Sequence, residues 1–219
     1  MPTPLRIDFV SDIACPWCAV GLNALERALA ELRGEVVAEL HFQPFELNPQ
    51  MGPEGEDADA HLAKKYGLAP AQLEQNRAVL RQRGAEVGFT FNRRERIVNT
   101  FDAHRLLHWA GGEGRQRELK HALLRAYFTE GQDVSRAEVL VGVAQAAGLD
   151  AARAQAILAS DEFAEAVRAQ EAFYQSRGIH AVPAVIVNQR HLIQGGQPAT
   201  VFEQALRQIA AEQPAVALH

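Results

Sequence analysis

The sequence predicts an α/β fold that is interrupted by a helical insertion. Strand and helix patterns alternate as far as Leu47, helix patterns then run almost alone from His61 to Ala159, and strand patterns return near the C-terminus. We therefore expect a discontinuous α/β domain formed by residues 1–56 and 160–219. Residues 57–159 are expected to form an inserted all-helical domain.

Composition limits the functions that the chain can have. Its 219 residues are 47% hydrophobic, which is enough for a sizeable core, and its formal net charge of −5 is unlike that of a nucleic-acid-binding surface. The short basic run Arg93-Arg94-Glu95-Arg96 fits a solvated loop. We expect no nucleic-acid partner.

The ends and the hydropathy of the chain bear on its location. Met1-Pro2-Thr3-Pro4 lacks a basic segment followed by an apolar run, and no apolar stretch is long enough to span a bilayer. We expect a cytoplasmic protein without a membrane partner. Because that compartment is reducing, paired cysteines there are better explained by a cycling thiol pair than by a permanent bond.

The first strand and helix meet at a proline. Leu5 to Val10 form a short apolar strand pattern, and apolar residues then recur at helical spacing from Val20 to Leu32. Proline suits the first helical position because its φ is preset and its missing N–H has no intrahelical partner there. We therefore expect the helix to begin at Pro16, with Cys15 as the N-cap.

The chain has two cysteines, Cys15 and Cys18, and both lie at this junction. A sulfur at the N-cap faces unpaired backbone N–H groups and the positive end of the helix dipole, and both favour thiolate. Cys15 is therefore the expected nucleophile. Cys18, one turn later, is placed to attack a disulfide between Cys15 and a substrate and so to release the product.

Three simpler interpretations of the two cysteines are buried free thiols, half of a zinc site and a static disulfide. A structural zinc site needs four Cys or His ligands, and the sequence has no second Cys-x-x-Cys and no spaced His pair. A bond that closes so small a ring would constrain the unfolded chain little. We expect no metal and no bound cofactor, only a redox-active Cys15–Cys18 disulfide.

A second strand pattern covers Val36 to Leu47. Strand, helix and strand within about forty residues predict a right-handed βαβ unit with parallel strands. Asn48-Pro49 and the stretch 52–59, rich in Gly, Pro and acidic residues, then break regular structure, so a boundary is expected near Glu56.

Helix signals follow one another along the insertion and beyond it. They comprise Pro70 as a first residue, Thr100 as the cap of a helix that reaches Gly111-Gly112, a capping box from Ser135 to Glu138, Asp150 as the cap of a helix to Leu158, and Ser160 as the cap of a helix to Arg177.

The last part of the chain predicts a β-hairpin and a final helix. The hairpin pairs Ala184–Val187 with 191–193 across a turn at Asn188-Gln189. Pro198 is expected as the first residue of the final helix, and the tail after Gln213 is expected to fray.

This order of elements is that of a thioredoxin fold, split by helices after its second strand. The chain resembles the DsbA-like thiol oxidoreductases, and more closely their cytoplasmic FrnE-type branch. The resemblance rests on Ser11-Asp12, on Cys15-Pro16-Trp17-Cys18 with Gly21, and on a later Val182-Pro183 before a strand. Further matching segments are Asn99-Thr100, Ala103 to Leu106, Tyr127-Phe128, Glu130-Gly131, Asp133-Val134 and Gly178-Ile179.

The resemblance implies a nucleophile at Cys15, a resolving partner at Cys18 and a cis peptide bond between Val182 and Pro183 beside them. The sequence departs from the family at Ala19-Val20, where an aromatic residue often comes first. The helical half also has no cysteine, so relatives with a second disulfide there are not a guide to this chain.

Several further residues are candidates for supporting roles. Asp8 could relay a proton from the resolving thiol, or could pair with Arg6. His180 could stabilise a thiolate as a cation, or could be an exposed loop residue. Trp17 could contact substrate or pack on the insertion. Asp12, Asn99 and His104 match the family pattern. Helix capping and core packing explain Asn99 and His104 almost equally well.

We expect a protein disulfide oxidoreductase or isomerase that acts on protein or small thiol and disulfide substrates, with glutathione as a candidate co-substrate. Two other functions fit the sequence: a glutathione-dependent transferase or isomerase of the same split fold, and a non-catalytic, chaperone-like binding module. Monomer and homodimer are both compatible with the sequence.

Overall fold

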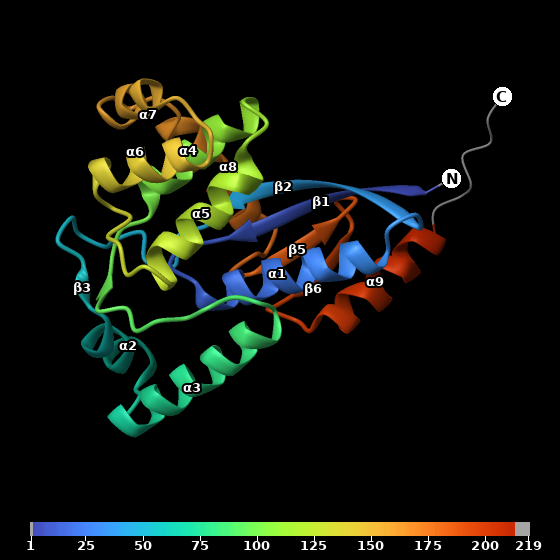
Figure 1. The fold of residues 1–219 in the computed structure, drawn as a ribbon, viewed down its shortest axis with the longest axis horizontal. Helices are drawn as coiled ribbons and strands as arrows, with labels where there is room; N and C mark the ends of the chain where they lie inside the picture. Colours follow the sequence, from blue (N-terminus) through green and yellow to red (C-terminus); the bar gives the residue numbers. More distant parts are fainter. Residues whose placement is uncertain (1, 213–219) are drawn as a thin grey trace.

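A four-stranded mixed sheet forms the centre of the computed structural model, which describes residues 2–212. Its strands are β1 (Thr3–Ser11), β2 (Val36–Pro44), β5 (Ala184–Val187) and β6 (His191–Gln194), in the order β2-β1-β5-β6 (Figure 1). β1 and β2 are parallel, β5 is antiparallel to β1, and β6 is antiparallel to β5. The predicted βαβ unit and hairpin are therefore confirmed.

Helices cover both faces of the sheet. On one face α1 (Pro16–Glu31) and α9 (Ala199–Ala211) lie side by side, and Figure 1 shows both running along the strands. α8 (Ala164–Ser176) packs on the other face, where Tyr174 meets Val10 in a small core. Val10 and its neighbour Phe9 belong to different core clusters because successive strand residues point to opposite faces.

The insertion is helical, as expected, apart from one two-residue ladder. Its helices are α2 (Ala58–Tyr66), α3 (Pro70–Glu86), α4 (Phe101–Gly112), α5 (Gln116–Phe128), α6 (Ala137–Ala146) and α7 (Ala151–Leu158). The short strands β3 (Glu56–Asp57) and β4 (Arg96–Ile97) pair antiparallel beside α2. Two residues are too few to give an alternating sequence pattern. In Figure 1, α4 to α7 gather at the end of the sheet opposite the N-terminus.

Of the five helix starts predicted from Pro70 to Ser160, three hold and two are wrong. Thr100 is the N-cap of α4, which ends at Gly112 as expected. Pro70 begins α3, and the Asp150 carboxylate caps α7 by accepting a hydrogen bond from the Arg153 backbone. The capping box at Ser135 is wrong: its hydroxyl donates to Asp133 (2.5 Å), and α6 begins at Ala137. α8 begins at Ala164 and not directly after Ser160, because Phe163 has a φ of 64° that no helix continues.

Smaller differences occur at the ends of other elements. Pro198 is the N-cap of α9 and not its first residue. β2 ends at Pro44, three residues before Leu47, because the Leu47 N–H donates to the Asp12 carboxylate (2.8 Å) and not to a strand. The expected fraying after Gln213 lies outside the described residues.

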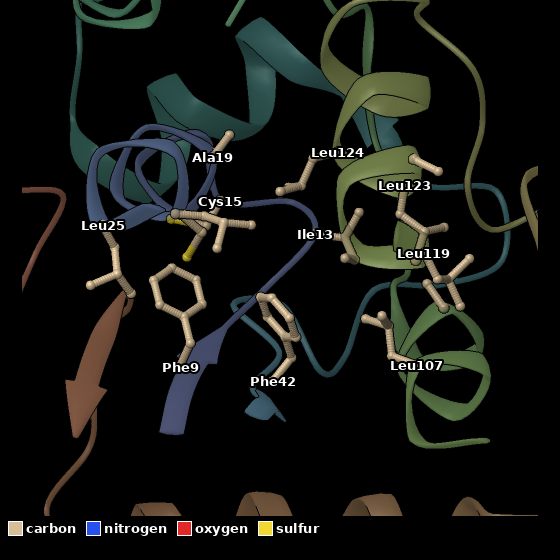
Figure 2. Close-up of a cluster of buried hydrophobic side chains, with 14 of the residues drawn as sticks. Phe9, Ile13, Cys15, Ala19, Leu25, Phe42, Leu107, Leu119, Leu123 and Leu124 are labelled. Carbon is tan, nitrogen blue, oxygen red and sulfur yellow. The ribbon is translucent and has the colours of Figure 1, made fainter. Parts of the chain in front are cut away.

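One continuous core joins the sheet to the insertion. Figure 2 shows Ile13 between α1 and a row of leucines on α5, with Phe9 below Cys15 and Phe42 beside it. The rings of Phe9 and Phe42 meet edge to face with centroids 6.0 Å apart, a favourable aromatic geometry. The segment that carries the cysteines is therefore packed against both parts of the molecule. Within residues 2–212, no helix has the length and apolar character needed to cross a membrane.

Candidate active site

Cys15 lies at the N-cap of α1, and Pro16 is the first helical residue, so both predictions are confirmed. The Cys15 backbone is extended (φ −91°, ψ 110°), as an N-cap requires. Its thiol donates to the carbonyl oxygen of Val182, with the sulfur 3.6 Å from the oxygen. The nucleophile candidate and the Val182-Pro183 loop are thus in contact, although 167 positions separate the two residues.

The Val182–Pro183 peptide bond is cis, as the resemblance implied. Two glycines allow this part of the chain to approach α1. A Cβ at Gly21 would lie 3.1 Å from Pro183 Cγ, and a Cβ at Gly196 would lie 2.9 Å from the Trp17 carbonyl oxygen. Because side chains at these positions would crowd their neighbours, glycine keeps the loop close to the sulfurs.

Cys18 is fully buried on the inner side of α1, and both thiols are free. Burial raises the pKa of the Cys18 thiol well above its usual value, and the hydrogen bond and charge of Cys15 raise it further. The positive charge of Lys120 and a hydrogen bond from the Asp12 backbone act in the opposite direction. Cys18 thus has the placement of a shielded second thiol, whereas Cys15, although only 4% exposed, lines a groove described below.

Asp12 is 1% exposed and connects the loop before α1 to two distant segments. Its carboxylate accepts hydrogen bonds from the Leu47 N–H (2.8 Å) and the Thr100 hydroxyl (2.8 Å), and His104 Nε2 lies 3.4 Å away. The Ala14 N–H donates to it as well (3.2 Å).

The pKa of Asp12 reflects these contacts. Burial raises it, but the hydrogen bond and the charge of His104 lower it, and the Leu47 and Thr100 hydrogen bonds act in the same sense. The net result is a pKa below the usual value, so Asp12 is an ionised carboxylate near neutral pH.

Thr100 is the N-cap of α4, but its hydroxyl donates to Asp12 and makes no capping hydrogen bond. Asn99 supplies the capping bond instead. Its Oδ1 accepts from the Phe101 N–H (2.9 Å), while its Nδ2 donates to the Met51 carbonyl (3.1 Å). Of the family-matching residues, Asp12 and His104 are brought together, and Asn99 has the placement of a capping residue.

Asp8 is not brought to the sulfurs. Its carboxylate accepts hydrogen bonds from Arg6 Nη2 (3.1 Å) and Gln43 Nε2 (2.8 Å). Strand alternation turns Asp8 away from the face on which Phe9 contacts α1. Of the two roles considered for Asp8, the structure therefore favours pairing with Arg6 over a proton relay.

A groove of about 740 Å³ opens at Cys15, between α1 and the helices α2 and α3. Trp17 and His180 line it together with Val182, and Trp17 is 38% exposed. These placements favour substrate contact for Trp17 and place His180 within the groove. The wall of the groove is largely apolar, with residues such as Phe45, Leu62, Leu80, Phe91 and Phe128.

Arg94 also lines this groove, which the sequence did not indicate. Its Nη1 donates to the Ala14 carbonyl (2.8 Å), and its guanidinium lies 5.3 Å and 5.6 Å from the ring centroids of Phe128 and Tyr127. The prediction of a fully solvated basic loop is wrong at this residue, because the aromatic rings that hold Arg94 lie more than thirty positions away in the chain. Arg94 therefore brings a positive charge to the residue that precedes Cys15.

Lys120 is a second residue near the cysteines that no sequence motif marks. It lies on α5 and is 1% exposed. A signal existed: Lys120 shares one helical face with Leu123, Leu124 and Tyr127, all buried. A lysine on such a face is rare without a specific partner.

Metal binding has no support among the residues that the structure describes, because they include no group of three or more His, Cys, Asp or Glu side chains that could hold an ion.

The fold and the site together define a class. A split thioredoxin fold, a cysteine at the start of its first helix, a second cysteine one turn later and a facing cis-proline loop are the features of thiol–disulfide proteins. The chain belongs to the DSBA-like thioredoxin domain family, which matches residues 6–207.

Individual relatives agree with this family. The chain is 36% identical in sequence to a probable DsbA oxidoreductase from Streptomyces coelicolor. The crystal structure of that protein matches with a TM-score of 0.91, over 98% of this chain and 94% of that one. The uncharacterized protein YwbO of Bacillus subtilis (strain 168) is 27% identical over 92% of this chain and 96% of its own. The cytosolic disulfide reductase DsbM from Pseudomonas aeruginosa, solved with GSH, shares the fold (TM-score 0.63, 16% identity, 94% and 99% coverage).

Membership of this family supports an enzyme role, since DsbA-like proteins act on thiol and disulfide substrates. The assignment to a FrnE-type branch stays a prediction.

Proposed function

We propose that the protein exchanges disulfides with protein or small-molecule substrates through Cys15 and Cys18. The observation that carries this proposal is the position of the Cys15 sulfur, at the start of α1, beside the Val182 carbonyl and at the edge of the groove. A substrate disulfide in the groove would lie beside Cys15, which lines the groove although it is only 4% exposed, whereas Cys18 is fully buried and does not line it.

The proposed reaction has two steps. In the first, the Cys15 thiolate attacks a substrate disulfide, a mixed disulfide forms, and one substrate sulfur leaves as thiolate. In the second, Cys18 attacks the Cys15 sulfur, the mixed disulfide breaks, and the Cys15–Cys18 bond forms. The substrate is reduced by two electrons and the protein is oxidised by two; the reverse sequence oxidises a dithiol substrate.

The groove supports a substrate that is partly apolar and partly anionic. Its volume of about 740 Å³ is within the range of small-molecule sites and also accommodates an extended peptide segment. Its charged lining comprises five basic residues and one acidic one: Lys65, Arg77, Arg81, Arg93 and Arg94, and Glu46. Glu46 pairs with Arg168, and Asp59 and Glu74 pair with Arg77, Arg81 and Arg93, so Lys65 and Arg94 supply the positive charge that an anionic substrate could use. Glutathione, an anionic thiol, is therefore part of the proposal as a co-substrate.

The same features support a proposed cytoplasmic location, where glutathione could recycle the pair. Residues 1–56 with 160–219, and residues 57–159, are proposed as the two domains.

Insulin reduction by glutathione, with wild-type protein, Cys15→Ser and Cys18→Ala, tests the proposal. We expect catalysis by the wild type, none by Cys15→Ser, and trapped mixed disulfides with Cys18→Ala. A transferase or isomerase would need glutathione and an electrophilic substrate but not Cys18, and a chaperone would suppress aggregation without either cysteine. Catalysis that survives the loss of Cys15 would overturn the proposal.

A further inference from the structure

Two basic side chains of the groove at Cys15 have no carboxylate partner. They are Lys65, in the last turn of α2, and Arg94, in the segment before β4. Among residues 2–212, no carboxylate lies within 4 Å of either charged group, whereas Asp59 and Glu74 pair with the three other basic residues of the groove. These two cations are therefore the ones that can bind an anion from outside the chain.

Arg94 is held next to the candidate nucleophile. Its Nη1 donates to the Ala14 carbonyl (2.8 Å), and Cys15 is the residue that follows Ala14. Its guanidinium also lies 5.3 Å from the ring centroid of Phe128, which lines the groove. A side chain that is already held by a carbonyl and a ring loses less conformational freedom when it binds an anion.

Lys65 is held in a similar way at a second point of the groove. Its Nζ donates to the Leu47 carbonyl (2.8 Å) and to Asn48 Oδ1 (2.6 Å). The same ammonium group lies 5.8 Å from the ring centroid of Tyr66. An ammonium group has three N–H donors, so one of them is left for a ligand. Each cation of the groove thus has a carbonyl partner and an aromatic neighbour.

One buried carboxylate ties both cations to the same framework. Asp12 accepts a hydrogen bond from the Ala14 N–H (3.2 Å), and the Ala14 carbonyl holds Arg94. Asp12 also accepts from the Leu47 N–H (2.8 Å), and the Leu47 carbonyl holds Lys65. The spacing of the two positive charges is therefore fixed by the backbone around the cysteine loop, and a ligand with two matching anionic groups gains from both at once.

Apolar side chains accompany the two cations and reach the surface of the groove. Trp17, Tyr66 and Val79 line it, and all three are exposed. A group of exposed large apolar side chains at one groove marks an interaction site. A small polar ligand would leave much of this apolar surface in water, whereas a peptide segment with apolar side chains would cover it.

We propose that Lys65 and Arg94 select acidic peptide segments as the disulfide substrates of this site. One carboxylate of the peptide binds Arg94 beside the reacting sulfur, a second binds Lys65, and apolar side chains of the peptide cover the exposed wall. This inference rests on the proposed disulfide exchange and specifies its substrate. The two cations determine specificity, and the bonds that form and break are those of the exchange described above.

Three peptides with acetylated and amidated ends test this selection. Each has a central cysteine in a disulfide with 2-thiopyridine, an apolar residue on either side of the cysteine, and glutamate, glutamine or lysine next to these apolar residues. The Cys15 thiolate attacks the peptide sulfur, a mixed disulfide forms, and pyridine-2-thione leaves, so its absorbance gives the second-order rate constant. At low ionic strength the glutamate peptide should react about twentyfold faster than the glutamine peptide, and the lysine peptide should be slowest.

Variants of the two cations assign the preference. Lys65→Met and Arg94→Gln should each lower the preference for glutamate over glutamine about fivefold, and the double variant should lose it. Lys64→Met is the matched control, because Lys64 lies on the same helix, is exposed and does not line the groove. It should keep the full preference. Lys65 is exposed, so Lys65→Met keeps the test valid if Arg94→Gln does not fold.

Oxidised glutathione separates a peptide substrate from a small anionic disulfide. It has carboxylates but no apolar side chains, and we expect Lys65→Met to slow its reaction with Cys15 less than that of the glutamate peptide. An equal or larger loss with oxidised glutathione would assign Lys65 to a small anionic disulfide and overturn the choice of a peptide.

The two proposals fail in different ways. If neither the peptides nor oxidised glutathione forms a mixed disulfide with Cys15, the proposed function fails. If the three peptides react equally fast, or if the preference for glutamate survives the loss of both cations, only the selection of acidic peptides is overturned.

Discussion

The Thr100 hydroxyl donates a 2.8 Å hydrogen bond to the carboxylate of Asp12, across 88 positions of the chain. Asp12 lies in the loop that leads to Cys15, and Thr100 immediately precedes α4 of the insertion. The N–H of Leu47, three residues after the end of β2, donates to the other oxygen of the same carboxylate. One buried side chain therefore fixes the cysteine-bearing loop relative to the helical part of the molecule.

Replacement of Asp12 by alanine should lower the free energy of unfolding by about 3–5 kcal/mol, because several buried donors would lose their acceptor. Urea denaturation at pH 7 measures this effect. Asp161→Ala, at an exposed position, is the matched control and should change stability by no more than about 0.5 kcal/mol. Equal effects of the two substitutions would contradict the structural role of Asp12.

The lowered pKa of Asp12 also predicts a pH dependence. A carboxyl whose folded-state pKa is below the unfolded value of 3.8 contributes stability above that pH, and the contribution disappears as the pH falls through the folded-state pKa. The stability difference between wild type and Asp12→Asn should therefore shrink from pH 6 to pH 3. Because both proteins share the other carboxyl groups, their difference in stability reports the titration of Asp12. A difference that is constant over the range would show that Asp12 is not the titrating group.

The two thiols should differ in reactivity. Cys18 is fully buried and its pKa is raised by that burial, whereas Cys15 lines the groove. In single-cysteine variants, iodoacetamide should therefore modify Cys15 at lower pH and faster than Cys18. Unfolded protein in urea, where both thiols should react alike, is the control. Faster reaction of Cys18 in the folded state would reverse the assignment of roles.

Arg94 should contribute to the binding of anionic substrates. Its guanidinium is held by the Ala14 carbonyl and two aromatic rings, and no carboxylate among residues 2–212 pairs with it. Arg94→Ala should raise the KM for oxidised glutathione about fivefold to tenfold, with a smaller change in kcat. Arg93→Ala is the comparison, because Asp59 already pairs with Arg93 and a smaller effect is expected. An unchanged KM for Arg94→Ala would remove this residue from the substrate site.

Local sequence patterns predicted the structure correctly where contacts between residues close together in the chain determine it. The start of α1 at Pro16, the capping of α7 by Asp150 and the hairpin from Ala184 all follow from residues a few positions apart. Ser135 failed as a cap because an equally local partner, Asp133, takes its hydroxyl.

The surroundings of the cysteines depend on contacts between distant segments, and these are the parts that sequence reasoning missed. The partners of Asp12 come from the segment after β2 and from the start of α4, and the rings that hold Arg94 come from the end of α5. Lys120 differs, because the sequence alone indicates that it is unusual: it is a lysine on an apolar helical face.

Replacement of Gly21 by alanine should show whether activity needs the close contact between α1 and the Val182-Pro183 loop, because it leaves both thiols in place. A Cβ at Gly21 would lie 3.1 Å from Pro183 Cγ and 3.3 Å from Gly196 Cα, so alanine would push the loop away from α1. Gly142→Ala is the matched control, because Gly142 also lies inside a helix and a Cβ there would meet nothing within 4 Å. Gly142→Ala should stabilise the protein by about 0.5–1 kcal/mol through helix propensity.

Gly21→Ala should instead destabilise the protein by about 1–2 kcal/mol, since the crowding exceeds the gain in helix propensity. Insulin turnover should fall, because the displaced Val182 carbonyl no longer faces the Cys15 sulfur, while alkylation of Cys15 by iodoacetamide should persist. Thermal unfolding, insulin reduction and alkylation on the same preparations check the three outcomes. If Gly21→Ala raised the melting temperature as much as Gly142→Ala and kept full insulin turnover, the close contact between α1 and the Val182-Pro183 loop would not be needed for activity.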